Sequence, residues 1–128
     1  MEIVKGMIGE VTTLVEREGT AAEVGSVSLL VYATPCMVAL MEGAACEAIN
    51  SALPEDKTSV GIELSIKHVS ATPVGLEVRA TAEVTAVEGN IISYNISAYD
   101  EAGLIGEGTH KRAIVTSQRF LDKTYAKV

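Results

Sequence analysis

The sequence TPCMVALMEGAACEAIN, residues 34–50, predicts one long helix that is apolar around most of its circumference. Thr34 is a favourable N-cap residue, and Pro35 suits the first helical position. At 100° per residue the apolar side chains spread over most of the helix surface, which is typical of a helix buried on several sides. They are Met37, Val38, Leu40, Met41, Ala44, Ala45, Ala48 and Ile49. We therefore expect a sheet to wrap around this helix.

Glu42 interrupts the apolar surface near the middle of the predicted helix. Its neighbours one turn away cannot pair with a carboxylate, since they are Val38, Ala39, Ala45 and Cys46. A buried charge without a partner is costly. Glu42 is therefore expected to have a partner from elsewhere in the fold or to be held in its neutral form.

Five segments alternate apolar and polar residues as half-buried strands do: 10–19, 59–69, 74–87, 91–99 and 104–116. Residues 20–33 are apolar without a clear period and are interpreted as a loop or short turn. One strand, one buried helix and four antiparallel strands predict a single α+β domain, 1–128, with its sheet wrapped around the helix. Such a sheet leaves a free edge or face, so we expect a homodimer or a higher homo-oligomer.

Composition narrows the class of protein. The 128 residues are 48% hydrophobic with a net charge of −7, and the positive residues are scattered, which argues against nucleic-acid binding. The sequence contains neither an apolar run of about 18 residues nor a signal-peptide pattern, so we expect no membrane partner and a cytoplasmic location. Cys36 and Cys46 lie about 15 Å apart on one helix, too far to form a disulfide, and free thiols suit that compartment.

Three polar residues are the candidates for catalysis. His68 shares the phase of the apolar face of segment 59–69, so it points toward the helix that carries Thr34 and Glu42. A histidine in such a position is more often a core residue, and Thr34 alone could be only a helix cap. A hydroxyl, a carboxylate and an imidazole on two contacting elements nevertheless suit acyl transfer or hydrolysis. The N–H groups of the helix start could stabilise a carbonyl oxygen.

Several motifs, in chain order, resemble the fluoroacetyl-CoA thioesterase-like family: ATPCMVALMEGAA (33–45), SVG (59–61), KHVSATPVG (67–75), VEG (87–89) and IGEGTHKRA (105–113). The resemblance implies the hot-dog fold, in which an antiparallel sheet wraps one long helix. It also implies a dimer that hydrolyses acyl-CoA thioesters without a cofactor. The family's catalytic residues fall on Thr34, Glu42 and His68, and its backbone-donor glycine falls on Gly61.

The sequence indicates the roles of Gly61, His110 and Arg112 less specifically. Gly61 could mark a bulge or a close approach of the backbone to a ligand. His110 and Arg112 share a phase on segment 104–116 and could bind the phosphate or pantetheine groups of CoA. Solvent-facing residues or an intersubunit ion pair explain them equally well. Metal binding by the two histidines is not expected, because no ligand spacing accompanies them.

The acyl group and the attacking group stay open at this stage. Residues 24–31 contain no phenylalanine where the fluoroacetyl-specific enzyme has a lid aromatic, and Ser28 is nearest in register, so an ordinary short acyl-CoA is expected. Thr34, Glu42 and water are alternative attacking groups. A non-catalytic acyl-CoA sensor is the alternative function, although the three polar groups together favour an enzyme.

Spacing along the helix presents a geometric problem. Eight residues separate Thr34 from Glu42, which places their backbones about 12 Å apart in a straight helix. Either the first turn is irregular, or a second subunit completes the site.

Overall fold

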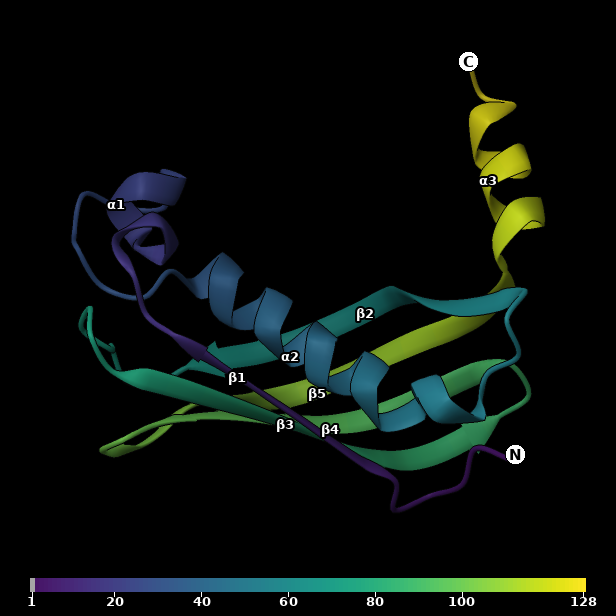
Figure 1. Cartoon of the computed structure of the whole chain (residues 1–128), viewed down its shortest axis with the longest axis horizontal. Helices are drawn as coiled ribbons and strands as arrows, with labels where there is room; N and C mark the ends of the chain where they lie inside the picture. The colour runs from purple at the N-terminus through teal and green to yellow at the C-terminus, as the bar shows by residue number, and fades with distance from the viewer. Residues whose placement is uncertain (1) are drawn as a thin grey trace.

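A five-stranded antiparallel sheet curves around one long helix in the computed structural model of the chain, which describes residues 2–128 (Figure 1). The strand order across the sheet is β1-β3-β4-β5-β2. The strands are β1 (Ile8–Leu14), β2 (Lys57–His68), β3 (Glu77–Glu88), β4 (Ile91–Asp100) and β5 (Gly103–Thr116), and the long helix is α2 (Thr34–Ile49). The predicted α+β arrangement is confirmed.

Two segments differ from the prediction. The strand expected over residues 10–19 ends at Leu14, and the chain continues into the 3-10 helix η1 (Arg17–Gly19) and the short helix α1 (Ala21–Val24). Gly25, with a φ of 78°, ends α1 in the left-handed conformation that glycine adopts easily. Helix α3 (Ser117–Tyr125) follows β5 and was not predicted, and a 3-10 turn, η2 (Asn50–Ala52), follows α2.

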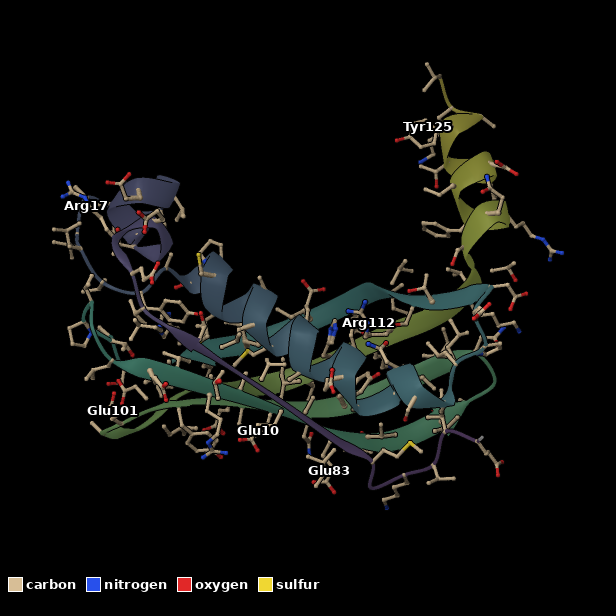
Figure 2. The ribbon with its side chains drawn as sticks, viewed as in Figure 1. Glu10, Arg17, Glu83, Glu101, Arg112 and Tyr125 are labelled. Carbon is tan, nitrogen blue, oxygen red and sulfur yellow. The ribbon has the colours of Figure 1, made fainter. Side chains whose placement is uncertain are left out.

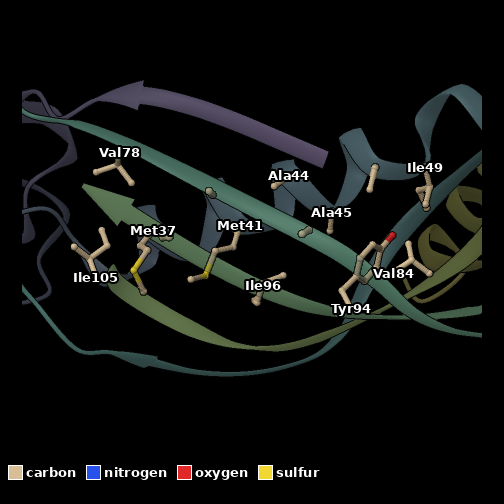
Figure 3. Packing of buried hydrophobic residues seen from close by; sticks show 14 of the residues in the cluster. Met37, Met41, Ala44, Ala45, Ile49, Val78, Val84, Tyr94, Ile96 and Ile105 are labelled. Carbon is tan, nitrogen blue, oxygen red and sulfur yellow. The ribbon is translucent and has the colours of Figure 1, made fainter. Parts of the chain in front are cut away.

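The core lies between α2 and the concave face of the sheet (Figure 3). Met37, Met41, Ala44, Ala45 and Ile49 are fully buried on α2. Four inward-facing residues of β3 are equally buried: Val78, Ala80, Ala82 and Val84. Small side chains on both surfaces let the helix approach the sheet closely, and burial of this apolar area stabilises the fold.

Strand β2 forms one free edge of the sheet. Within residues 2–128 it pairs only with β5, and α2 packs chiefly on β1 and β3 and makes few contacts with β2. The apolar face predicted for segment 59–69 is therefore only partly covered, and Ile62 is 51% exposed. An edge strand of twelve residues with an open apolar side chain is a surface that a second chain can cover.

Two glycines provide a matched test of the packing between α2 and β1. A Cβ at Gly9 would overlap backbone atoms of Ala44 and Ala48 on α2, whereas a Cβ at Gly43 would meet nothing nearer than Val11 Cγ2 at 3.9 Å. We expect Gly9→Ala to lower the free energy of unfolding by about 1–3 kcal/mol. Gly43→Ala should raise it by about 0.5–1 kcal/mol, because alanine favours a helix interior. Urea denaturation measures both, and a Gly9→Ala variant as stable as the parent would refute the close packing.

Candidate active site

The start of α2 and the end of β2 bring Thr34 and His68 together. Thr34 is the first residue of α2, and Ala33 occupies the N-cap position, so the predicted capping role of Thr34 is wrong. Its hydroxyl instead forms a 2.7 Å hydrogen bond with Nδ1 of His68, the last residue of β2. The predicted orientation of His68 toward the helix is confirmed.

The environment of His68 keeps its imidazole neutral. Burial lowers the pKa of His68 below its usual value of 6.5, and the backbone of Ser70, near the ring but outside hydrogen-bond geometry, opposes this shift. Within residues 2–128, nothing forms a hydrogen bond with the buried Nε2. A neutral ring with its proton on Nε2 accepts the Thr34 hydroxyl proton at Nδ1 and leaves one donor for another group.

A cleft of about 290 Å³ opens beside this pair. Its walls come from the segment before α2 and from the segment after β2, together with Thr34 and His68 themselves. The other lining residues are Ala21, Ser26, Val27, Val31, Tyr32, Val69, Ser70 and Ala71. The cleft thus combines small apolar walls with a polar floor, which suits a small acyl group attached to a reactive carbonyl.

Glu42 belongs to a second polar cluster, formed with Arg112 and His110 of β5. Its Oε2 lies 3.5 Å from Arg112 Nη1 and 4.0 Å from His110 Nε2. The expectation of a partner from elsewhere in the fold is therefore confirmed. Burial of the carboxylate was predicted incorrectly, because the Glu42 side chain is 41% exposed. Figure 2 shows Arg112 on the sheet, beside α2.

Arg112 is held by a set of hydrogen bonds inside the protein. Its Nε donates to Ser59 Oγ at 2.8 Å and its Nη2 to the Ser59 carbonyl at 2.9 Å. Arg112 is 6% exposed and His110 is 2% exposed, so the solvent-facing interpretation of both residues is wrong. A buried guanidinium needs such partners, and Glu42 supplies the opposite charge.

The tautomer of His110 follows from its neighbours. Its Nδ1 lies 2.9 Å from the carbonyl of Glu63, which can only accept, so Nδ1 carries the proton. Its Nε2 is then free to accept from Arg112 Nη1 at 3.2 Å. Burial is the main cause that lowers the pKa of His110, and the charge of Arg112 also lowers it. The ring stacks on Tyr94, with centroids 5.9 Å apart.

Gly61 is the point of β2 at which this cluster reaches the surface. A Cβ at Gly61 would lie 2.6 Å from Glu42 Oε2 and 3.2 Å from His110 Cε1. The pairing of β2 with β5 shifts between Gly61 and Glu63, so the predicted bulge is confirmed. A hollow of about 300 Å³ opens here, lined by Val38, Glu42, Gly61, Ile62, Glu63, Leu64 and His110.

The residues predicted for one site are thus divided between two clusters in this chain. Thr34 and His68 form the first, whereas Glu42, Gly61, His110 and Arg112 form the second. Helix α2 is continuous from Thr34 to Ile49, so the alternative of an irregular first turn is wrong. Sequence reasoning missed Ser59, whose only signal is its place two residues before Gly61 in the SVG motif.

Two further observations concern ligands and membranes. Over the described range, 2–128, His, Cys, Asp and Glu side chains form no group of three that could hold a metal ion. Cys36 and Cys46 on α2 are free thiols, as predicted. In the same part of the chain, every helix is too short or too polar to span a membrane.

Comparison with known proteins supports the sequence resemblance. Residues 15–118 match the family described as fluoroacetyl-CoA-specific thioesterase. A fluoroacetyl-CoA thioesterase of Streptantibioticus cattleyicolor is 41% identical over 97 residues, which cover 76% of this chain and 70% of that protein.

Solved structures agree with the sequence comparison. A crystal structure of the fluoroacetyl-CoA thioesterase FlK superposes with a TM-score of 0.92 at 33% identity, covering 100% of this chain and 99% of that one. A thioesterase superfamily member of Thermus thermophilus superposes at 0.84 with 30% identity, covering 99% and 98%. A hot-dog-like protein of Thermanaerovibrio acidaminovorans, 23% identical with a TM-score of 0.86 over 96% of this chain and 91% of that one, shares the fold. The predicted hot-dog fold is therefore confirmed, and the chain belongs to the fluoroacetyl-CoA-specific thioesterase family.

Proposed function

We propose that this protein hydrolyses the thioester bond of a short-chain acyl-CoA, releasing the free acid and CoA, as a single-domain cytoplasmic enzyme. The observation that carries the proposal is the 2.7 Å hydrogen bond between Thr34 Oγ1 and His68 Nδ1 at the floor of an open cleft. A hydroxyl joined to a neutral imidazole is the arrangement that activates an oxygen nucleophile. A sensor would need the cleft but not this pair.

The proposed reaction uses the two nitrogens of His68 for different tasks. Nδ1 accepts the proton of Thr34 while the hydroxyl oxygen attacks the thioester carbon, and the Nε2 proton is aimed at the carbonyl oxygen as it gains charge. CoA then leaves as its thiol after it takes the proton from His68. Water, deprotonated by a carboxylate, attacks the acyl-threonine ester, and the same proton passes to the Thr34 oxygen as the free acid leaves; Glu42 is the candidate base.

The cleft supports a small acyl group as the substrate. Its apolar walls include Val27 and Val31, and residues 24–31 supply no aromatic side chain that could close over a fluorinated group. FlK has been crystallised as a mutant with acetyl-CoA. An acyl group of similar size fits the volume of about 290 Å³ together with the start of the pantetheine chain. We therefore propose ordinary short acyl-CoA thioesters over fluoroacetyl-CoA.

A homodimer would bring the two clusters together. In antiparallel pairing of two β2 edges, the end of one strand lies opposite the first half of the other, so His68 would face Gly61 of the partner subunit. Glu42 of the partner subunit would then lie across from Thr34. In this arrangement His110 and Arg112 act on the bound substrate through Glu42, whose carboxylate they position, and the N–H of Gly61 can donate to the carbonyl oxygen.

His68→Ala tests the central pair. We expect kcat to fall by roughly 10²-fold or more, as for general acid–base residues, while the Kd for a non-hydrolysable acyl-CoA stays within about threefold. Direct detection of thiol release measures turnover on acetyl-, propionyl- and butyryl-CoA. A large loss of melting temperature with a normal single-turnover rate per folded molecule would make His68 a structural residue.

The pH dependence follows from the lowered pKa of His68. The neutral ring is the active form, so kcat/KM should stay constant from pH 8 to about 6.5 and fall at lower pH, because His68 gains a proton only below 6.5. The folded state also loses stability as the pH falls below about 6.5, since the unfolded chain binds these protons more readily. A urea titration at each pH separates the two effects. An acid limb centred above pH 7 would contradict this assignment.

Mixed dimers test whether one site draws residues from two chains. Glu42→Gln and His68→Ala should each remove most of the turnover. Co-expressed with different affinity tags and purified as heterodimers, they should recover activity, because one of the two sites then combines an intact Thr34–His68 pair with an intact Glu42. We expect roughly half of the wild-type rate per dimer. Complete inactivity of the heterodimer, with both parent homodimers folded, would place all catalytic groups within one chain.

A further inference from the structure

Helix α3 stands away from the rest of its own chain. It leaves the end of β5 and projects beyond the β2 edge of the sheet, with Tyr125 toward its outer end (Figure 2). All of its side chains except that of Ser117 are exposed, including those of Phe120 (40%), Leu121 (47%) and Tyr125 (69%). These three apolar residues cover roughly 140° of the helix at 100° per residue, so α3 is amphipathic.

A helix this short needs a surface to pack against. Isolated helices below about 12–15 residues are marginal in water, and α3 has nine. Within the described residues its contacts to its own chain lie at its first turns, where Arg119, Phe120 and Lys123 border a hollow with Ile114 and Val115. The apolar side chains nearer its outer end, Leu121 and Tyr125, therefore point to a second chain.

A second exposed apolar surface lies at the other end of β2. Residues 24–31, between α1 and the cleft, expose Val24 (43%), Val27 (53%), Leu29 (61%) and Leu30 (54%). Val27 also lines the cleft that contains Thr34 and His68. In Figure 1, α1 and α3 rise beyond the same sheet edge, at opposite ends of β2.

The two-fold axis that places His68 opposite Gly61 of the partner subunit would also bring these two surfaces together. It exchanges the ends of the paired edge strands, so that α3 of one subunit lies over residues 24–31 of the other. The charges are complementary as well. Residues 117–127 contain three basic side chains and one acidic one: Arg119, Lys123, Lys127 and Asp122. Residues 16–24 contain three acidic side chains and one basic one: Glu16, Glu18, Glu23 and Arg17.

We propose that α3 packs through Phe120, Leu121 and Tyr125 against residues 24–31 of the partner subunit, and so forms an outer wall of the partner's acyl cleft. The inference rests on the homodimer put forward above and assigns α3 a role in it. Each chain then supplies its partner with more than Glu42, because the cleft of one subunit is closed by the C-terminal helix of the other.

Hydrogen exchange tests the contact directly in the full-length protein. We expect Leu121→Asp to speed amide exchange in residues 26–31 by roughly tenfold, because a buried carboxylate opens the packed surface. Val4→Asp is the matched control, since Val4 is 48% exposed against 47% for Leu121 and lies near the N-terminus. It should leave the exchange of residues 26–31 unchanged. Equal exchange in the parent and in Leu121→Asp, both dimeric by ultracentrifugation, would overturn the proposal.

A mixed dimer shows that the contact passes between subunits. Wild-type chain labelled with ¹⁵N is combined with unlabelled Leu121→Asp, and mass spectrometry follows the labelled and the unlabelled peptides separately. Faster exchange in labelled residues 26–31 supports packing in trans, whereas faster exchange confined to the unlabelled chain overturns it in favour of contact within one chain.

Activity provides an independent measurement. Leu121→Asp should raise KM for the acyl-CoA by several fold with kcat within about threefold, because the cleft wall changes and Thr34 and His68 do not. If the wild-type protein hydrolyses no thioester, the proposed function fails while the exchange results still decide the packing of α3. If hydrolysis is present and exchange is unaffected, only the inference about α3 fails.

Discussion

The close packing of α2 against the sheet is the constraint on which the other features depend. Alanine side chains on the helix and the glycine at position 9 of β1 let the two backbones approach, and even a Cβ at position 9 would overlap the backbone of Ala44 and Ala48. A helix held so firmly cannot bend to bring Thr34 toward Glu42. Thr34, at the start of the helix, therefore contacts His68 of β2. Glu42, at the middle of the helix, contacts His110 and Arg112 of β5.

The parts of the fold that could be predicted are those with a strong local period. The alternation of apolar and polar residues was sufficient to predict β3, because its inward side chains belong to the same core as α2 and its outward ones are polar. His68 was placed correctly for the same reason, since it keeps the phase of its strand. The prediction of a strand over 10–19 was wrong because Val15, which is apolar and buried, continues the alternation past the real end of β1 at Leu14.

Other features had no local signal. Helix α3 begins after Thr116, whose side chain makes no capping hydrogen bond, and it has only three apolar side chains, so its packing partner decides whether it forms. Glu42 and Arg112, which form an ion pair, lie 70 positions apart in the sequence. The bulge at Gly61 also changes the phase of the alternation in β2. Arg112 looks like an ordinary surface residue of an alternating strand. It is buried because Ser59, His110 and Glu42 together satisfy its donors and its charge.

Gly61 connects the strand backbone to the chemistry of this cluster, since a methyl group there would occupy the place of the Glu42 carboxylate. Substitutions at positions 61, 42 and 112 are consequently expected to depend on one another. A related protein with alanine at position 61 would keep an active site only if a second substitution shortened or moved the acidic side chain at position 42. Within the family, we therefore expect these three positions to change together, whereas the apolar residues that pack on α2 can be substituted one at a time.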